Sequence, residues 1–259
     1  MRDGFAAGAA RPLNRLPAKI TSPISVKPAI ILFGSPGSGK GTQAKSLRQH
    51  LKIPHISTGD MLRAHIEAGD HVGNQARALL KSGKLVPDDL VNELVEIRIA
   101  EPDCRSGIIL DGYPRTVNQA AVLLKLLGRD GFQTVVVHLI VDCEIIVARL
   151  SGRRQCPVCG TLYSLSTHPP KVAGVCDLDG ATLVTRDDDR ESVIRERLDQ
   201  YKMQTRPLLN HFRDAGVSIF EINGGSASPE EITGQICDSL IFSGFIARQE
   251  SISGASVSK

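Results

Sequence analysis

Short apolar runs alternate with stretches of helical apolar spacing along most of the 259-residue chain. The runs that predict buried strands are 29–33, 107–111, 135–141 and 217–222. The stretches that predict helices are 43–51, a segment capped by Ser57 or Thr58, 72–81, 87–101, a helix ending near Leu127, 142–151, a long charged helix from about Asp189, and 229–241. Strands alternating with helices predict an α/β fold, a parallel sheet flanked by helices on both faces.

Two stretches interrupt this alternation. Residues 57–86 predict an all-helical insertion between two strands, and residues 152–189 lose periodicity altogether. The second stretch has few large apolar residues and cannot build a core of its own, so it needs another source of order. The remaining segments, 29–56, 87–151 and 190–248, form the predicted core domain.

Both ends of the chain predict disorder. Residues 1–28 are rich in basic residues and alanine, and their prolines prevent a sustained amphipathic helix. A disordered extension is the interpretation we favour, with an organelle transit peptide or a misassigned start codon as alternatives. The tail, 249–259, is mostly Ser, Gly and Ala, which predicts an unstructured segment.

Overall charge and hydropathy exclude several classes of protein. The net charge is only +3, which gives no global attraction to nucleic acid, and no apolar run approaches the roughly 20 residues of a membrane span. We therefore expect neither a nucleic-acid nor a membrane partner. The six cysteines, three of them clustered, indicate a metal site in a reducing compartment, and hence a cytoplasmic protein.

The segment from Phe33 to Thr42 has the sequence FGSPGSGKGT and lies between a predicted strand and a predicted helix. Glycines allow backbone N–H groups to point at an anion, the helix adds its positive end, and Lys40 supplies a mobile cation. This context predicts a phosphate-binding loop. Gly41 follows the lysine where the general pattern has Ser or Thr, so the hydroxyl comes one position later, at Thr42.

The irregular stretch 152–189 contains two short pairs of potential metal ligands, Cys156 with Cys159 and Cys176 with Asp179. Each pair is followed by glycine, a spacing typical of a zinc ribbon. Asp179 is the preferred fourth ligand, and Asp177 and His168 are chemically acceptable alternatives. Four protein ligands predict a structural zinc ion, whereas a redox pair or free thiols is the competing interpretation. The other cysteines, Cys104, Cys143 and Cys237, are predicted to be core residues.

Arginines gather near loop-to-helix junctions and around the irregular stretch, at Arg63, Arg115, Arg153, Arg186 and Arg197, with Arg149 and Arg154 close by. Forked cationic donors suit the transfer of a phosphoryl group between two phosphate chains. Asp111, at the end of a predicted strand, is a carboxylate suited to a position near magnesium. By contrast, Arg190, Arg195 and the run 187–189 are predicted to be solvated surface, although these aspartates could instead pair with arginines and latch a moving flap.

Residues 29–240 resemble adenylate kinase, in its long-lid, zinc-containing bacterial form. The motifs that carry the resemblance are 34–42, 57–63 (STGDMLR), 83–86 (GKLV), 111–115 (DGYPR) with Gln119, 152–154 (GRR) and 186–189 (RDDD) with Arg197. Tyr113 stands where the family commonly has Phe. The resemblance implies the P-loop nucleoside-monophosphate kinase fold and reversible conversion of ATP and AMP into two ADP, with Mg²⁺ bound to ATP and a structural Zn²⁺.

The resemblance also implies the roles of individual residues. The ATP-binding residues would be Gly37, Ser38, Gly39, Lys40, Gly41, Thr42, Arg149, Arg153, Leu162 and Tyr163. The AMP-binding residues would be Thr58, Arg63, Lys84, Leu85, Val86, Gly112, Tyr113, Pro114, Arg115, Gln119, Arg186 and Arg197. The catalytic residues would be Lys40, Arg115, Arg153, Arg186 and Arg197. Residues 57–86 would form the AMP-binding flap and 152–189 the lid of a monomer, with no residue assigned to the adenine contact near 224–226.

Three alternatives remain open at this point. A kinase for another monophosphate shares the loop, although uridylate and cytidylate kinases usually carry Ala in place of Thr58 and have a short lid without metal. GTP could replace ATP as the donor. A nucleic-acid-binding switch protein could combine a phosphate loop with a zinc ribbon, but the near-neutral charge and the lack of a basic, aromatic face argue against it.

Overall fold

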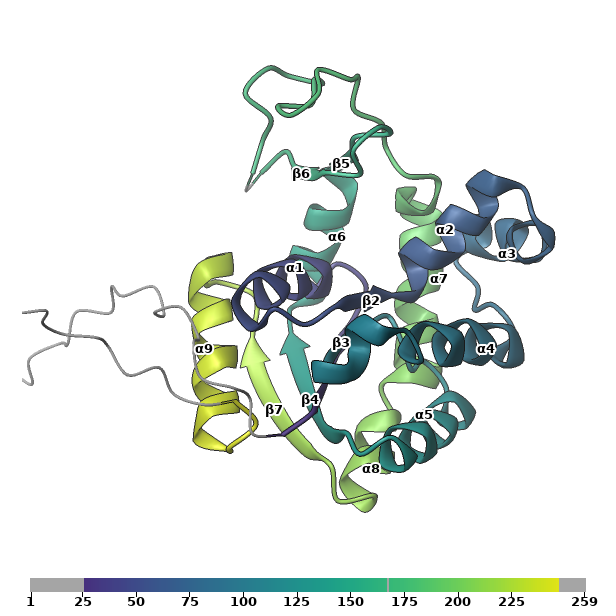
Figure 1. The fold of residues 1–259 in the computed structure, drawn as a ribbon. Coiled ribbons are helices and arrows are strands. Elements are labelled where there is room, and N and C mark those ends of the chain that lie inside the picture. The colour runs from purple at the N-terminus through teal and green to yellow at the C-terminus, as the bar shows by residue number, and fades with distance from the viewer. Residues whose placement is uncertain (1–25, 167, 247–259) are drawn as a thin grey trace, which may run out of the picture.

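The computed structural model describes residues 26–166 and 168–246. Within these residues, five strands form a parallel sheet in the order β2–β3–β1–β4–β7 (Figure 1). The strands are β1 (Pro28–Phe33), β2 (His55–Ser57), β3 (Ile108–Asp111), β4 (Gln133–Ile140) and β7 (Ser218–Asn223). The predicted α/β fold is confirmed. Because the strands are parallel, their carboxyl ends lie at one edge of the sheet, where the loops after β1 and β3 meet.

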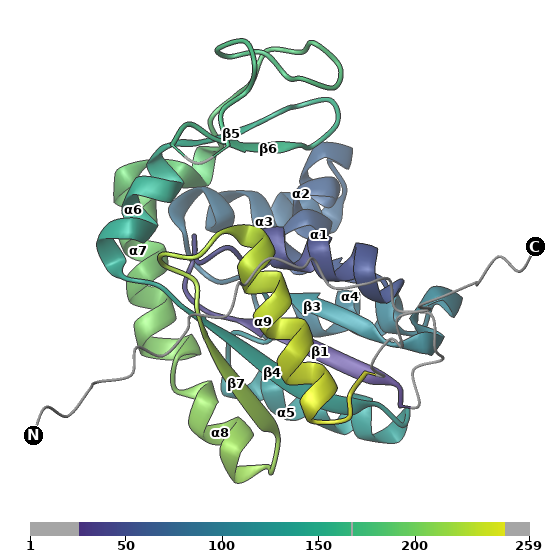
Figure 2. The same cartoon turned by 90° about the vertical axis from the view of Figure 1, so that its left-hand side faces the viewer.

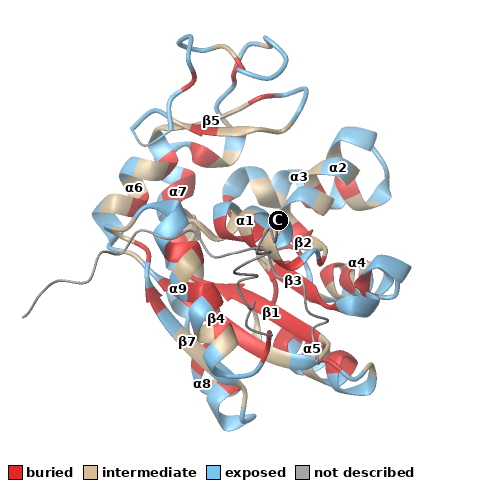
Figure 3. Ribbon diagram, turned by 60° about the vertical axis from the view of Figure 1, so that its left-hand side comes forward, coloured by how far each residue is buried: buried red, intermediate tan, exposed pale blue. Residues whose placement is uncertain are grey.

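Alternate residues of the central strand β1 pack into two separate hydrophobic cores, one on each face of the sheet. Ile30 and Leu32 face helices α1 (Lys40–Leu51) and α9 (Pro229–Phe242), whereas Ala29 and Ile31 face the opposite core. That second core contains side chains of α4 (Asp88–Ile99), α5 (Val117–Arg129) and α8 (Leu208–Asp214). Strand β1 is buried along its whole length, as its continuous apolar sequence requires (Figure 3).

Two excursions leave the sheet at its carboxyl edge. The first is the helix pair α2 (Thr58–Ala68) and α3 (His71–Ser82), in which Ser57 caps α2 by accepting a hydrogen bond from Asp60 N. The second is the segment 152–189, which contains the antiparallel strands β5 (Arg153–Gln155) and β6 (Leu162–Ser164). This segment projects beyond α1 and α6 (Cys143–Ser151) in Figures 1 and 2. Its few buried apolar residues form a separate small cluster.

The structure corrects two expectations and adds three short strands. The long charged helix from about Asp189 is instead a 3₁₀ turn, η2 (Asp187–Asp189), followed by α7 (Glu191–Gln200), a π-helical turn, η3 (Tyr201–Thr205), and α8. Cys143 is exposed at the start of α6, not in the core, whereas Cys104 and Cys237 are buried as predicted. Strands β2, β5 and β6 were not predicted, because three residues are too few to show a period.

The remaining expectations concern the two ends of the chain and the possibility of a membrane span. Residues 1–25 and 247–259 lie outside the described residues, and so do most of the predicted extension and the whole predicted tail. Strand β1 begins one residue earlier than predicted, at Pro28. Among the described residues, no helix is both long and apolar enough to cross a membrane.

Candidate active site

The loop between β1 and α1 has the backbone conformation of an anion-binding turn. Gly37 has φ +81°, and a Cβ atom there would lie 2.8 Å from Leu150 Cγ. Gly34 has φ +146°, and a Cβ atom there would lie 2.6 Å from the Leu139 carbonyl oxygen. A side chain is therefore excluded at both positions. Helix α1 has no acidic residue in its first turn, so its positive end is not neutralised from within the helix.

Lys40 lies at the start of α1 with its ammonium group folded back over the loop. Its Nζ donates hydrogen bonds to the carbonyl oxygens of Gly34, at 2.8 Å, and Ser35, at 2.9 Å. Burial lowers the pKa of Lys40 to about 8, although the nearby Asp111 carboxylate opposes this shift. An anion placed against the loop would supply the countercharge that the two carbonyl dipoles provide only in part.

Asp111, at the carboxyl end of β3, faces the phosphate loop. A Cβ atom on Gly41 would lie 3.4 Å from Asp111 Oδ2, and His55 Nε2 lies 3.6 Å from the same oxygen. Burial alone would raise the pKa of Asp111, but His55 and the charge of Lys40 outweigh burial and hold that pKa below its ordinary value. An ionised carboxylate beside a phosphate loop is a suitable oxygen donor toward Mg²⁺.

One cavity of about 1000 Å³ joins the phosphate loop to both excursions. It is lined by most of the residues predicted to bind nucleotide, namely Gly37, Ser38, Gly39, Lys40, Gly41, Thr42, Arg63, Leu85, Gly112, Tyr113, Pro114, Arg115, Arg149, Arg153, Leu162, Tyr163, Arg186 and Arg197. Leu32 and Ile232, which are 200 positions apart in the sequence, therefore line a single space. Its cationic character comes from the arginines, which belong to several separate elements.

Arg153 and Arg197 converge on two aspartates of η2. Arg153 donates two hydrogen bonds to the Asp189 carboxylate, one of them from Nε at 2.7 Å. Arg197 Nη1 lies 2.7 Å from Asp188 Oδ2 and 3.5 Å from Asp189 Oδ1. The Asp189 side chain is 0% exposed, so the expectation that the run 187–189 is solvated is wrong for Asp188 and Asp189. The sequence pattern could not show this, because consecutive charges resemble a surface run.

Only Asp187 of that run behaves as predicted. Its side chain is 66% exposed and lies 3.3 Å from Lys81 Nζ on α3. Arg190 and Arg195 are also exposed, in agreement with the prediction. The alternative that aspartates pair with arginines therefore holds for the half-buried Asp188 and the buried Asp189, at the junction between the segment 152–189 and helix α7.

The other cavity arginines also have oxygen partners. Arg115 Nε donates to the Gly112 carbonyl at 2.8 Å, and Arg63 Nη2 donates to Asp60 Oδ1 at 2.5 Å. Arg186 donates to the side-chain oxygen of Gln155. Burial, together with neighbouring guanidinium groups, lowers the pKa of Arg115 and of Arg186 to about 10. Both groups stay protonated at neutral pH, and their crowding favours binding of a multivalent anion.

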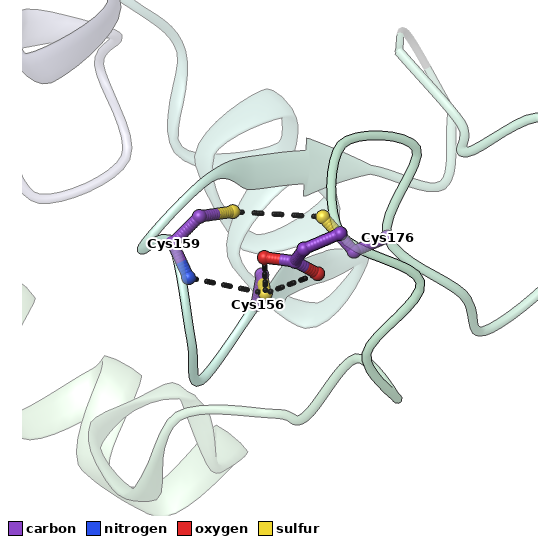
Figure 4. Close-up of side chains that lie close together, drawn as sticks. Cys156, Cys159 and Cys176 are labelled. Atoms are coloured by element: carbon purple, nitrogen blue, oxygen red, sulfur yellow. Dashed lines mark hydrogen bonds between the residues drawn. The ribbon is translucent and has the colours of Figure 1, made fainter.

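The four predicted zinc ligands lie together in the segment 152–189. Figure 4 shows the thiol groups of Cys156, Cys159 and Cys176 gathered around a carboxylate, which is that of Asp179. One donor atom from each residue lies within 4.8 Å of all the others. The two turns are equivalent, since the N–H following each pair donates to the carbonyl of the pair's first cysteine. Three thiols and one carboxylate in this arrangement fit a tetrahedral Zn²⁺.

The two alternative fourth ligands have other contacts. Asp177 Oδ1 accepts a hydrogen bond from Lys171 N at 2.8 Å. The ring of His168 stacks on that of Tyr163 and lines the cavity. Neither residue belongs to the group of donors that could share an ion, so among the described residues the geometry favours Asp179.

Comparison with known proteins shows the family to which the chain belongs. A family model described as adenylate kinase matches residues 32–217. The chain belongs to the adenylate kinase family. It is 46% identical over 212 residues to an adenylate kinase of Methanococcoides burtonii, covering 82% of this chain and 97% of the relative. It is 48% identical over 206 residues to one of Anaeromyxobacter dehalogenans and 46% identical over 204 residues to one of Moorella thermoacetica, in both cases covering 78% of this chain and 94% of the relative.

Several residues predicted from the adenylate kinase resemblance do not line the cavity. Thr58 is buried and donates to the Gly112 carbonyl at 3.0 Å. Gln119 donates to Asp88 Oδ1 at 2.8 Å and accepts from the backbone N–H of Arg115. Lys84 is exposed and Val86 is buried, and neither contributes to the cavity lining. Their roles in AMP binding stay predictions.

Other residues of this adenylate kinase line the cavity without having been assigned to it. Tyr201 and Thr205 reach it from the π-helical turn η3, where Thr205 Oγ1 donates to the Arg115 carbonyl at 3.0 Å. A π-helical turn keeps an apparently helical sequence pattern and so gave no signal. Arg149 Nη2 donates to the Gly224 carbonyl at 2.8 Å, which connects α6 to the loop left unassigned near 224–226.

Proposed function

We propose that the phosphate loop and the segment 152–189 hold ATP, and that the α2–α3 helix pair holds AMP at the other side of the same cavity. The reaction of this enzyme is the reversible transfer of a phosphoryl group from MgATP to AMP, which gives two ADP and helps to balance the adenine nucleotides. The observation that carries the proposed placement is the single cavity in which loop amides, Lys40 and the guanidinium groups converge.

In this proposal the groups of the chain act mainly by position and charge. The loop amides and Lys40 hold the ATP phosphates, and Lys40 exchanges its two carbonyl partners for phosphate oxygens. Arg115 and Arg63 orient the AMP phosphate, while Arg153, Arg186 and Arg197 neutralise charge on the group in transfer. Mg²⁺ supplies further charge neutralisation when bound, with the Asp111 carboxylate as the chain's donor toward it.

The segment 152–189 is proposed to be a lid that closes over the nucleotides and excludes water, which would otherwise accept the phosphoryl group. The cluster of Cys156, Cys159, Cys176 and Asp179 would hold a structural Zn²⁺. The ion would compensate for a core of only a few buried residues, so that the lid moves as one rigid body. Zinc in this role takes no part in phosphoryl transfer.

We further propose that the enzyme works as a monomer in the cytoplasm, without nucleic-acid or membrane partners. None of its cysteines forms a disulfide within the described residues, which fits a reducing compartment. The small net charge of +3 fits small-molecule substrates better than a polyanion.

Two experiments test the proposal. ATP supplied with AMP, CMP, UMP or GMP should yield ADP efficiently only with AMP, and GTP should replace ATP poorly. Lys40→Met should lower kcat/KM for ATP by at least about 100-fold, because a buried cation facing the phosphates is lost. Lys125→Met, on an exposed position of α5, is the matched control and should leave activity unchanged. Full activity of Lys40→Met would refute the proposed site.

A further inference from the structure

The three cysteines of the predicted zinc site differ in their access to solvent. Cys156 and Cys176 are 0% and 3% exposed, whereas Cys159 is exposed. As zinc ligands all three would be thiolates, and exposure then decides which of them a small oxidant in solution reaches first. Cys159 is therefore the most accessible point of attack in the site.

The Cys159 sulfur lies next to that of Cys176, which belongs to the other turn of the site. The two sulfur atoms are 3.6 Å apart, and a dashed line joins them in Figure 4. The two residues are 17 positions apart in the sequence, so a bond between them would join the two turns. An exposed sulfur with a buried sulfur at contact distance is the arrangement of a reactive cysteine beside its resolving cysteine.

Cys156 is a less suitable partner for Cys159, although it belongs to the same turn. Its sulfur accepts hydrogen bonds from the backbone N–H groups of Val158 and Cys159, each at 3.4 Å, and donates to the Asp179 carboxylate at 3.2 Å. The Cys156 sulfur would have to leave these contacts to attack Cys159, whereas the Cys176 sulfur is already beside it. The geometry therefore favours the pair from different turns over the pair within one turn.

We propose that Cys159 is an oxidation site, and that a peroxide joins Cys159 to Cys176 in a disulfide while the zinc ion is released. This inference rests on the zinc site given under the proposed function. The new bond removes two of the four donors, and the thiolate and carboxylate that remain fall short of the four ligands of a structural zinc site. The segment 152–189 then has a covalent link between its two turns in place of the metal.

The reaction balances with hydrogen peroxide as the oxidant. The Cys159 thiolate attacks one peroxide oxygen, the O–O bond breaks, and the departing hydroxide takes a proton from solvent to become water. Cys159 is then a sulfenic acid, whose sulfur the Cys176 thiolate attacks. The S–O bond breaks, the second hydroxide also becomes water, and the two sulfurs have together given two electrons to the peroxide. A dithiol reductant reverses the bond by thiol–disulfide exchange.

The test treats the full-length, zinc-loaded enzyme with hydrogen peroxide. A chromophoric chelator measures zinc release, and mass spectrometry of tryptic peptides, after alkylation of free thiols, identifies the disulfide. Cleavage after Lys171 places Cys176 on a different peptide from the other two cysteines, and fragmentation then shows which of those two is linked to it. We expect zinc release and the disulfide between Cys159 and Cys176 to rise together, mole for mole, and a dithiol with added zinc to restore the starting state.

Two variants that keep four potential zinc ligands separate the pairings. Cys159→His should bind zinc and release it at least about tenfold more slowly in peroxide, because the exposed thiolate is lost. Cys156→His should bind zinc and release it within about twofold of the unsubstituted rate, because the proposed pair is intact. Cys143→Ser, which removes an exposed cysteine outside the site, is the control and should change neither rate nor pairing.

The peptide map of the unsubstituted enzyme decides the pairing even if a histidine variant binds no zinc. A disulfide that includes Cys156 would overturn the proposal. So would zinc release without any disulfide, or retention of zinc while Cys143 is oxidised. Failure of the zinc site itself would appear differently, as an untreated enzyme that contains no zinc.

Discussion

Replacing Asp189 by asparagine tests whether the buried aspartate stabilises the junction between the proposed lid and α7. The carboxylate is fully buried, receives two hydrogen bonds from Arg153 and lies 3.5 Å from Arg197. The amide of Asn keeps one acceptor oxygen but carries no charge. Arg153, whose side chain is 18% exposed, would then lose its carboxylate partner, and Arg197, 16% exposed, would keep only Asp188.

The expected cost follows from this burial. Removing one partner of a buried ion pair destabilises a protein by roughly 3–5 kcal/mol, and the retained acceptor places Asp189→Asn near the lower end, about 3 kcal/mol. For a chain of this size that corresponds to a fall in melting temperature of about 6–12 °C. Asp187→Asn is the matched control two residues away. Its carboxylate is 66% exposed and faces a 54% exposed Lys81, so its loss should cost less than about 1 kcal/mol.

Thermal and urea unfolding of both variants, with and without saturating ATP, provide the assay. Without nucleotide, Asp189→Asn should melt well below Asp187→Asn. With ATP the difference between the two melting temperatures should narrow, because phosphate oxygens bind and neutralise the guanidinium groups that the carboxylate no longer neutralises. Equal, small shifts for both variants would show that the buried pair contributes no more than a surface pair, and would refute the reasoning.

The remaining predictions concern pH and metal. With the Lys40 pKa lowered from 10.5 to about 8, kcat/KM for ATP should fall as pH rises above 8, to about a tenth at pH 9, whereas Lys40→Arg should give a flat profile. Between pH 8 and 10.5 folded Lys40 binds fewer protons than unfolded Lys40, so its contribution to the free energy of unfolding rises over that range. A fall in that contribution over the same range would contradict the lowered pKa of Lys40. Removing zinc with a chelator should lower the melting temperature by roughly 10 °C while changing phosphoryl transfer far less, and unaltered melting would exclude a structural ion. Asp179→Asn should lower zinc content and Asp177→Asn should not, as measured by metal analysis of the purified variants.

The parts of the molecule that follow from local pattern were predictable. Strand β1 is a continuous apolar run because both its faces are buried, and the loop after it has the glycines that its backbone requires. The two turns that bring the predicted zinc ligands together were also predictable, because the residues of each pair are only three positions apart and a tight turn suffices. In each case the relevant contacts lie within a few residues of one another, so the sequence contains the whole signal.

The parts that depend on distant partners were not predictable from pattern. Asp189 has the sequence environment of a surface residue, and only its position beside Arg153, 36 residues away, buries it. Cys143 was expected in the core, but the first turn of α6 directs it to solvent. His168 offered acceptable zinc chemistry, yet its backbone bridge to Ser164 places its ring on Tyr163 and toward the cavity. Charge and chemical type alone do not reveal which neighbour a side chain has.

The lysine and arginines predicted to bind phosphate already have oxygen partners within the chain. These partners reduce the net free energy that a phosphate gains on binding. Those partners are the carbonyls of Gly34, Ser35, Gly112 and Gly224, the carboxylates of Asp60, Asp188 and Asp189, and the amide of Gln155. An arriving phosphate must displace them, so it gains only the difference between two sets of hydrogen bonds. The arginines are thereby oriented before an anion arrives, at the cost of part of its binding free energy. Because Asp189 lies where the lid joins α7, releasing Arg153 from it would couple the arrival of phosphate to movement of the lid.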